Sequence, residues 1–156
     1  MEPFVAFKYL HVVAMFFAIA LAVSTELVVR RIAGSADASA IRTTVGRTRP
    51  LANLSNAFFI AGIIFGFVAA LTGQMNLLAP WLILAYVAVA GAFGIGMLVT
   101  DPWVARLDAA ATASPEGAAS ADLQAVIDEP LARIGTWALM ILIALLVFLM
   151  VVKPFA

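Results

Sequence analysis

Residues 4–31 read FVAFKYLHVVAMFFAIALAVSTELVVRR and decide the class of this protein. The apolar run over residues 4–29 exceeds the roughly 20 residues that a helix needs to cross a bilayer. Three ionisable side chains, Lys8, His11 and Glu26, interrupt it, and His11 is the only histidine of the chain. Because ionisable groups in membrane helices are costly and mark functional sites by default, each of the three needs an explanation.

The composition of the whole chain indicates an integral membrane protein. Of the 156 residues, 65% are hydrophobic and 12% are charged, and the mean hydropathy is +1.09. A soluble domain typically carries about 25% charged residues. The formal net charge of 0 and the pI near 6.5 argue against nucleic acid as a partner. With no cysteine, the chain forms no disulfides, thiolate metal sites or covalent haem linkages.

Four apolar stretches predict an all-α integral membrane four-helix bundle in one domain, residues 1–156. The expected membrane helices cover residues 4–29, 51–72, 77–100 and 131–152. The charge-free run 50–100 is too long for one crossing but fits two helices and a tight turn. Since Glu2 stands where a signal peptide has basic residues, we expect the first helix to be retained.

Two loops, residues 30–50 and 101–130, are expected between these helices. In the first loop, Ser35 or Asp37 can cap a short surface helix, which Gly46 and Pro50 then break. At the start of the second loop, residues 100–102 read as a helix stop followed by a restart. The last helix is expected to begin near residue 120 and to kink at Pro130.

The basic residues predict the orientation of the bundle. Seven of the nine fall in the two expected loops and their edges: Arg30, Arg31, Arg42, Arg47, Arg49, Arg106 and Arg133. Short loops rich in Lys and Arg lie on the cytoplasmic side of a membrane. We therefore expect both termini to be outside.

Small residues at four-residue spacing predict where helices pack closely. Gly62 and Gly66 lie in the second expected helix, and Ala88, Ala92 and Gly96 lie in the third. Such spacing lets two membrane helices approach closely. We expect the second and third helices to pack against each other through these faces.

One face of the first helix carries its ionisable residues. By steps of three and four, this face contains Lys8, His11, Met15, Ala18, Ala22 and either Thr25 or Glu26. The face is expected to look inward, because ionisable groups avoid lipid. His11 lies about 10 Å below the outer end, at 1.5 Å per residue. The same depth on the other helices brings Gly66, Tyr86 and residue 146 to its level.

This placement motivates the hypothesis that His11 is an axial ligand of a b-type haem. Imidazole is a haem ligand, and bundle interiors are where such cofactors bind. The glycine at Gly66 would leave room for a flat group beside His11, with Tyr86 at the same level. The side chains of Lys8, Gln74 and Lys153 lie near the outer surface, where propionates would be. A sixth ligand would come from Met15, Met75, Met140 or Met150, or from His11 of a second subunit.

Two other interpretations of the ionisable residues stay open. His11 can instead hydrogen-bond to Tyr86 or to a backbone carbonyl and hold helices together. Glu26 lies about 22 Å along the axis from His11, so the two cannot share one site. Its spacing to Arg30 suits an ion pair on one helix, with a proton-relay role as the alternative.

Three segments carry a family resemblance: KYLHVVAMFFAIALAVSTELVVRR (residues 8–31), the Arg-containing loop and LAPWLILAYVAVA (residues 78–90). Together they resemble a bacterial family of four-helix integral membrane proteins of unknown function. The element Leu10-His11-Val12 is also similar to the first helix of copper resistance protein D and of the membrane protoporphyrinogen oxidase of the haem pathway. These resemblances imply a location in the bacterial cytoplasmic (inner) membrane and a haem-linked or copper-linked histidine. Only His11 carries over.

Three classes of function therefore remain open. A haem-binding redox or haem-handling protein would show a Soret band, and a copper-handling protein would hold metal through His11 and methionines. A structural or assembly subunit, in a homo-oligomer or a larger membrane complex, would show neither. No serine–histidine, metal-cluster or phosphate-loop pattern in the sequence supports a soluble type of enzyme, and catalytic activity stays undecided.

Overall fold

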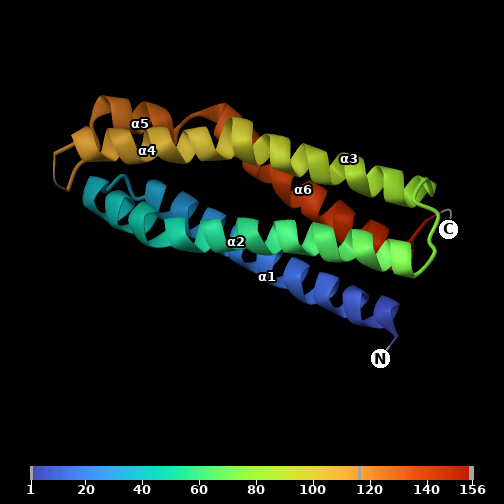
Figure 1. Ribbon diagram of the computed structural model, residues 1–156. Helices are drawn as coiled ribbons and strands as arrows, with labels where there is room; N and C mark the ends of the chain where they lie inside the picture. The colour runs from blue at the N-terminus through green and yellow to red at the C-terminus, as the bar shows by residue number, and fades with distance from the viewer. Residues whose placement is uncertain (1, 116, 155–156) are drawn as a thin grey trace.

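A computed structural model describes residues 2–115 and 117–154 as an elongated bundle of helices. In chain order these are α1 (Pro3–Ala33), α2 (Ala38–Thr72), α3 (Pro80–Ile95), the π-helical turn η1 (Gly96–Thr100), α4 (Asp101–Ala113), α5 (Ala121–Ile127) and α6 (Pro130–Val152). Figure 1 shows the α1–α2 turn, α4 and α5 at one end of the bundle and both termini at the other. We call these the arginine end (residues 30–50 and 101–130) and the terminal end.

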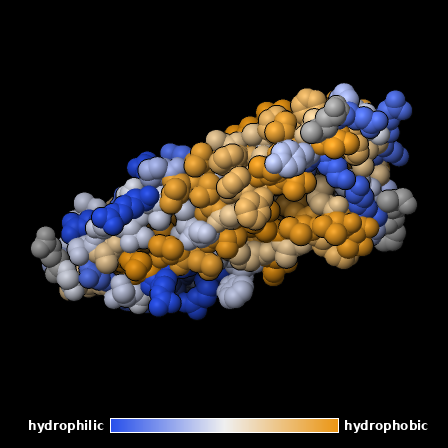
Figure 2. Space-filling model, turned by 90° about the horizontal axis from the view of Figure 1, so that it is seen from below, coloured by the Kyte–Doolittle hydropathy of each residue, from blue (hydrophilic) through white to orange (hydrophobic). Residues whose placement is uncertain are grey.

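The all-α class and the number of apolar helices agree with the sequence-based expectation. Within the described residues, four helical segments are long and apolar enough to cross a membrane: Pro3–Ala33, Ala38–Thr72, Pro80–Ala113 and Ala121–Val152. Figure 2 shows apolar side chains over the middle of one face and hydrophilic ones towards the two ends. This distribution is the one expected of a multi-pass membrane protein.

The loop expected at residues 30–50 is wrong, because helix covers nearly all of it. α1 continues to Ala33, and α2 then runs without interruption through Gly46 and Pro50. The predicted cap at Asp37 is confirmed, since its side chain accepts hydrogen bonds from the backbone N–H groups of Ser39 and Ala40. Proline in a helix interior removes a hydrogen bond. Here tertiary packing outweighs that cost, because the turns before Pro50 are buried through Ile41 and Val45.

A hydrophobic core at the arginine end explains these long helices. Its buried members come from four helices and the first turn of a fifth: Val29, Ala33, Ala38, Ile41, Val45, Trp103, Leu107, Ala111, Leu123 and Ala132. The 35 residues of α2 span about 52 Å, whereas the hydrocarbon core of a bilayer is about 30 Å thick. The helices therefore extend beyond the apolar belt and pack against one another there.

The segment 101–130, expected between the third and fourth membrane helices, is also mostly helical. The helix does not stop at residues 100–102, because α3 passes through η1 directly into α4. The backbone N–H of Asp101 bonds to the carbonyl of Gly96, five residues back. This wider turn accommodates Pro102, which has no N–H to donate. Helix α5 begins after the cap Ser120, as expected, and α6 begins at Pro130 as a separate helix.

The expected packing of the second helix against the third is wrong. The described helices pack as two main pairs, α1 with α2 and α3 with α6. Gly62 and Gly66 face α1, where a Cβ atom on either would meet Met15 or His11. On α3, Ala85 and Ala88 form one buried cluster with Leu146 and Leu149 of α6. Small residues thus bring helices together as predicted, but with different partners, because their spacing says nothing about which helix lies opposite.

The capping carboxylate of Asp37 predicts a small pH dependence of stability. Hydrogen bonds from the backbone N–H of Ala40 and from Ser39 hold the pKa of Asp37 below its usual value of 3.8. The capping stabilisation is present above pH 3.8 and is lost as the pH falls through the lowered pKa. Asparagine caps without titrating. The midpoint temperature of thermal unfolding in detergent should therefore decrease less at acid pH for Asp37→Asn than for the wild type. Identical pH profiles of the two midpoints would contradict this role.

Candidate cofactor pocket

A pocket of about 450 Å³ lies towards the terminal end, between the α1–α2 pair and the α3–α6 pair. Its walls are mainly apolar and aromatic, and come from α1, α2, α3, α6 and the residues next to them. Pockets for small molecules and cofactors typically measure about 300–1,000 Å³ and have a few polar groups in an apolar lining. The residues proposed from the sequence, Lys8, His11, Gly66 and Tyr86, all line this pocket.

The imidazole of His11 is held in place by a hydrogen bond from Nδ1 to the carbonyl oxygen of Gly62, at 2.7 Å. A carbonyl only accepts, so Nδ1 carries the proton and donates it. In the neutral ring the other nitrogen, Nε2, then has a free lone pair. Histidines that bind metals are oriented in the same way, with the second nitrogen donating to a carbonyl or carboxylate. A purely structural histidine would make this same hydrogen bond, so the contact fits both a structural role and a role as a ligand.

Gly66 lies directly beside the ring of His11. A Cβ atom at this position would be 2.6 Å from Nδ1 and 2.9 Å from Cε1 of His11, distances too short for any real contact. The sequence correctly placed a glycine opposite the histidine. The space directly over Gly66 is occupied by the imidazole itself, so the room for a further group is the rest of the pocket that both residues line.

Two lysines lie at the end of the pocket nearest the termini. Lys8 and Lys153 both line it. The Nζ atom of Lys8 is 5.8 Å from the ring centre of Phe4, and that of Lys153 is 5.5 Å from the ring centre of Trp81. A lysine over an aromatic face keeps its ammonium near the apolar pocket at modest cost. Gln74, which the sequence grouped with them, does not line the pocket.

Three of the four methionines considered as ligands are close to the pocket. Met15, Met75 and Met150 line it, and Met140 does not. No group of three or more His, Cys, Asp or Glu side chains suited to a metal ion occurs among the described residues. A metal at this place would therefore depend on His11 and thioether sulfurs.

Tyr86 and residue 146 were expected at the depth of His11. Tyr86 lines the pocket from α3, opposite α1. Leu146 is instead buried between α3 and α6. Sequence reasoning also missed Trp81, which is buried and lines the pocket. The depth of a residue follows from counting, whereas the direction of its side chain depends on how the helices are rotated.

The ion pair predicted between Glu26 and Arg30 is confirmed. Arg30 Nε lies 3.0 Å from Glu26 Oε1, and the same oxygen accepts a hydrogen bond from Thr136 of α6. The guanidinium of Arg30 lies 4.0 Å from the ring centre of Trp103 and donates to the carbonyl of Ala132. Helix spacing predicts the pair, but the contacts from α4 and α6 come from residues far away in the sequence.

Comparisons of the chain with models of known families, with curated proteins and with solved structures find no match.

Proposed function

We propose that this protein is a small multi-pass protein of the bacterial cytoplasmic membrane that binds b-type haem through His11, in a redox or haem-handling role. The observation that carries the proposal is the hydrogen bond from His11 Nδ1 to the Gly62 carbonyl at the wall of a 450 Å³ pocket. It leaves Nε2 as a Lewis base in an apolar space between helices, which is the setting of haem in helical bundles.

The charged residues of the pocket support the same ligand. A b-type haem is a large apolar ring with two carboxylates at one edge, so its site needs an apolar body and cations at one end. Lys8 and Lys153 supply cations at the terminal end, and His11 lies three residues, about 4.5 Å, deeper along α1 than Lys8. A second axial ligand would come from Met15, Met75 or Met150, or from His11 of another copy in a homo-oligomer.

Copper is the second candidate, and the methionines favour it. Thioether sulfur selects Cu(I), and imidazole also binds copper. The size of the pocket favours haem, because a single ion with two or three ligands does not require 450 Å³. A structural or assembly subunit would need neither ligand, and His11 would then serve only to join α1 to α2.

An absorption spectrum and a metal analysis of the same preparation test the proposal. Wild-type protein made with ample haem and copper and purified in detergent should show a Soret band. His11→Ala should abolish the band while the protein stays folded and inserted, and added imidazole should restore part of it because it can replace the missing ring. As a control, Tyr9→Ala removes an exposed ring from another face of α1 and should keep the band.

The other outcomes decide between the candidates. Bound copper without a Soret band, lost in His11→Ala, would replace haem by copper. A wild-type preparation carrying neither would end both hypotheses and leave the structural role standing.

We also propose that the arginine end faces the cytoplasm and that both termini lie outside. Seven of nine basic residues are on the two segments of the arginine end or at their edges, and only Lys8 and Lys153 are at the terminal end. A reporter fused after residue 156 should therefore be active only as a periplasmic or extracellular enzyme. Cytoplasmic activity of the fusion would reject this orientation.

A further inference from the structure

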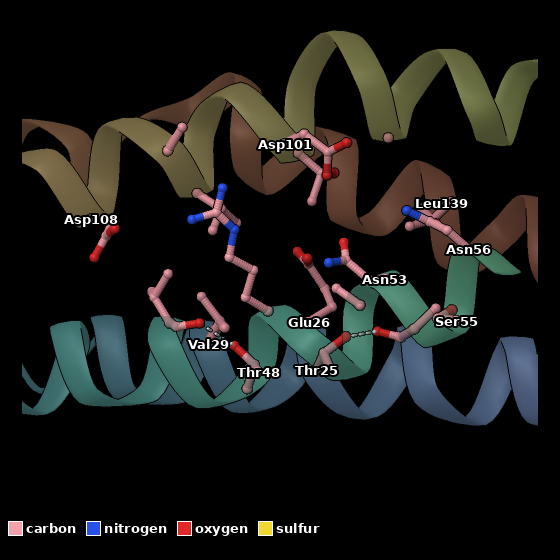
Figure 3. A pocket seen from close by; sticks show the side chains of 18 residues that line it. Thr25, Glu26, Val29, Thr48, Asn53, Ser55, Asn56, Asp101, Asp108 and Leu139 are labelled. Carbon is pink, nitrogen blue, oxygen red and sulfur yellow. Dashed lines mark hydrogen bonds between the residues drawn. The ribbon is translucent and has the colours of Figure 1, made fainter.

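A second cavity, of about 440 Å³, lies next to the arginine end and has a different character. Figure 3 shows Glu26 of α1, Asn53 of α2 and Asp101 of α4 directed into the space between these helices. On α2 the lining runs from Val45 to Asn56, about 16 Å at 1.5 Å per residue. The cavity therefore reaches from the arginine end into the charge-free part of the bundle. A polar cavity of this size holds water.

Glu26 carries one of the charges of this cavity. It is 6% exposed, and only its Oε1 atom has hydrogen bonds described, from Arg30 and Thr136. The carboxylate points towards the amide of Asn53 in Figure 3. Arg30 and Thr136 both donate to Oε1, so Oε2 accepts no hydrogen bond within the described residues.

Two further observations concern the opposite wall. Asp101 lines the cavity and makes no side-chain hydrogen bond or ion pair within the described residues. The hydroxyl of the neighbouring Thr100 is buried and has no hydrogen-bond partner in the described part of the chain. Thr100 is the last residue of the π-helical turn η1 and Asp101 follows it directly, and such turns occur often at functional sites. A buried hydroxyl without a partner is costly, so it points to a missing ligand or water.

The balance of charge selects the kind of ligand. Glu26, Asp101 and Asp108 line the cavity with three carboxylates, against one lysine or arginine, Arg49. Even with Arg30 counted as the partner of Glu26, one negative charge remains uncompensated. An excess negative charge in a cleft with low-dielectric helix walls concentrates cations. The volume exceeds the need of a bare ion and suits a small organic cation with water around it.

We propose that this cavity is a binding site for a small organic cation of the ammonium or guanidinium class, which enters from the arginine end. Glu26 and Asp101 face the cationic group from two sides, and the amides of Asn53 and Asn56 and the hydroxyl of Thr100 supply neutral partners. The site is independent of the haem proposal, since Glu26 lies about 22 Å along α1 from His11.

The absence of cysteine from the chain allows a direct test. Ala52→Cys places one thiol in the cavity without removing a proposed ligand group, and Asn53→Cys is a second reporter on the same wall in case the first variant does not fold. Each is placed in lipid nanodiscs and treated with a cationic or an anionic methanethiosulfonate reagent. Leu54→Cys is the matched control, because Leu54 is the next residue, is 46% exposed on the outside of the bundle and does not line the cavity.

The expected result is a reaction of the cavity thiol about tenfold faster with the cationic than with the anionic reagent, after correction for their rates with a free thiol. Methylguanidinium chloride should slow this reaction severalfold relative to sodium chloride of equal ionic strength. The control thiol should react slowly with both reagents and show no protection. In an Asp101→Asn background, the cationic preference and the protection should both decrease.

Three results would overturn the proposal. If the cavity thiol reacts as slowly as the Leu54→Cys control, the space is not open to water. If the anionic reagent reacts as fast as the cationic one, the cavity does not select cations. If sodium chloride protects as well as methylguanidinium, the effect is ionic screening and no organic cation is bound.

Discussion

Arg30→Met is expected to lower the free energy of unfolding by about 3 kcal/mol, because it leaves the buried carboxylate of Glu26 without its cation. This value is the lower end of the range for broken buried ion pairs, since Arg30 keeps 20% of its side chain exposed and Glu26 keeps the hydrogen bond from Thr136. The variant also loses the contact of the guanidinium with Trp103 and the hydrogen bond to Ala132. Chemical or thermal unfolding in detergent measures the loss.

The neighbouring Arg31 provides the control for this variant. Arg31 is exposed at the same end of α1, so Arg31→Met removes the same charge from the sequence without breaking a described contact, and should change stability by less than about 0.5 kcal/mol. The double variant Glu26→Gln/Arg30→Met should recover part of the loss, because no unpaired buried charge remains. Equal losses in Arg30→Met and Arg31→Met would show that the ion pair does not stabilise the fold.

Gly66→Leu is expected to lower stability by about 2 kcal/mol and to displace His11 from its hydrogen bond with Gly62. Its Cβ atom would be 2.6 Å from His11 Nδ1, and the remaining leucine atoms would push α1 away from α2. Leucine favours a helix over glycine by about 1 kcal/mol, which offsets part of the strain but does not exceed it. The variant should lose any cofactor that depends on the position of the imidazole.

Gly94→Leu is the matched control, because nothing lies within 4 Å of a Cβ atom at Gly94. There the gain in helix propensity should dominate, and stability should stay equal or rise slightly. Thermal unfolding in the same detergent compares the two variants. If Gly66→Leu were as stable as Gly94→Leu, α1 would not approach α2 as closely as the structure describes.

Much of the site was predictable because the spacing of residues in one helix fixes which side chains share a face. The inward face of α1 could be read from the positions of Lys8, His11 and Glu26 alone, and the pair between Glu26 and Arg30 follows from one helical turn. Counting from the helix ends also brought Gly66 and Tyr86 to the depth of His11. These inferences use only the pitch of a helix and the thickness of a membrane.

Contacts between helices distant in the sequence were not predictable in this way. Gly66 packs against His11 and not against a residue of α3, and α2 continues through Pro50. Both features depend on which helix faces meet and on how much surface they bury. The amino-acid sequence by itself determined an all-α protein with four helices long and apolar enough to cross a membrane, because apolar length and missing charge act locally. Only the tertiary structure decided the partners of each helix, the separate pockets around His11 and Glu26 and the core at the arginine end, because packing energy is shared among residues that no local pattern connects.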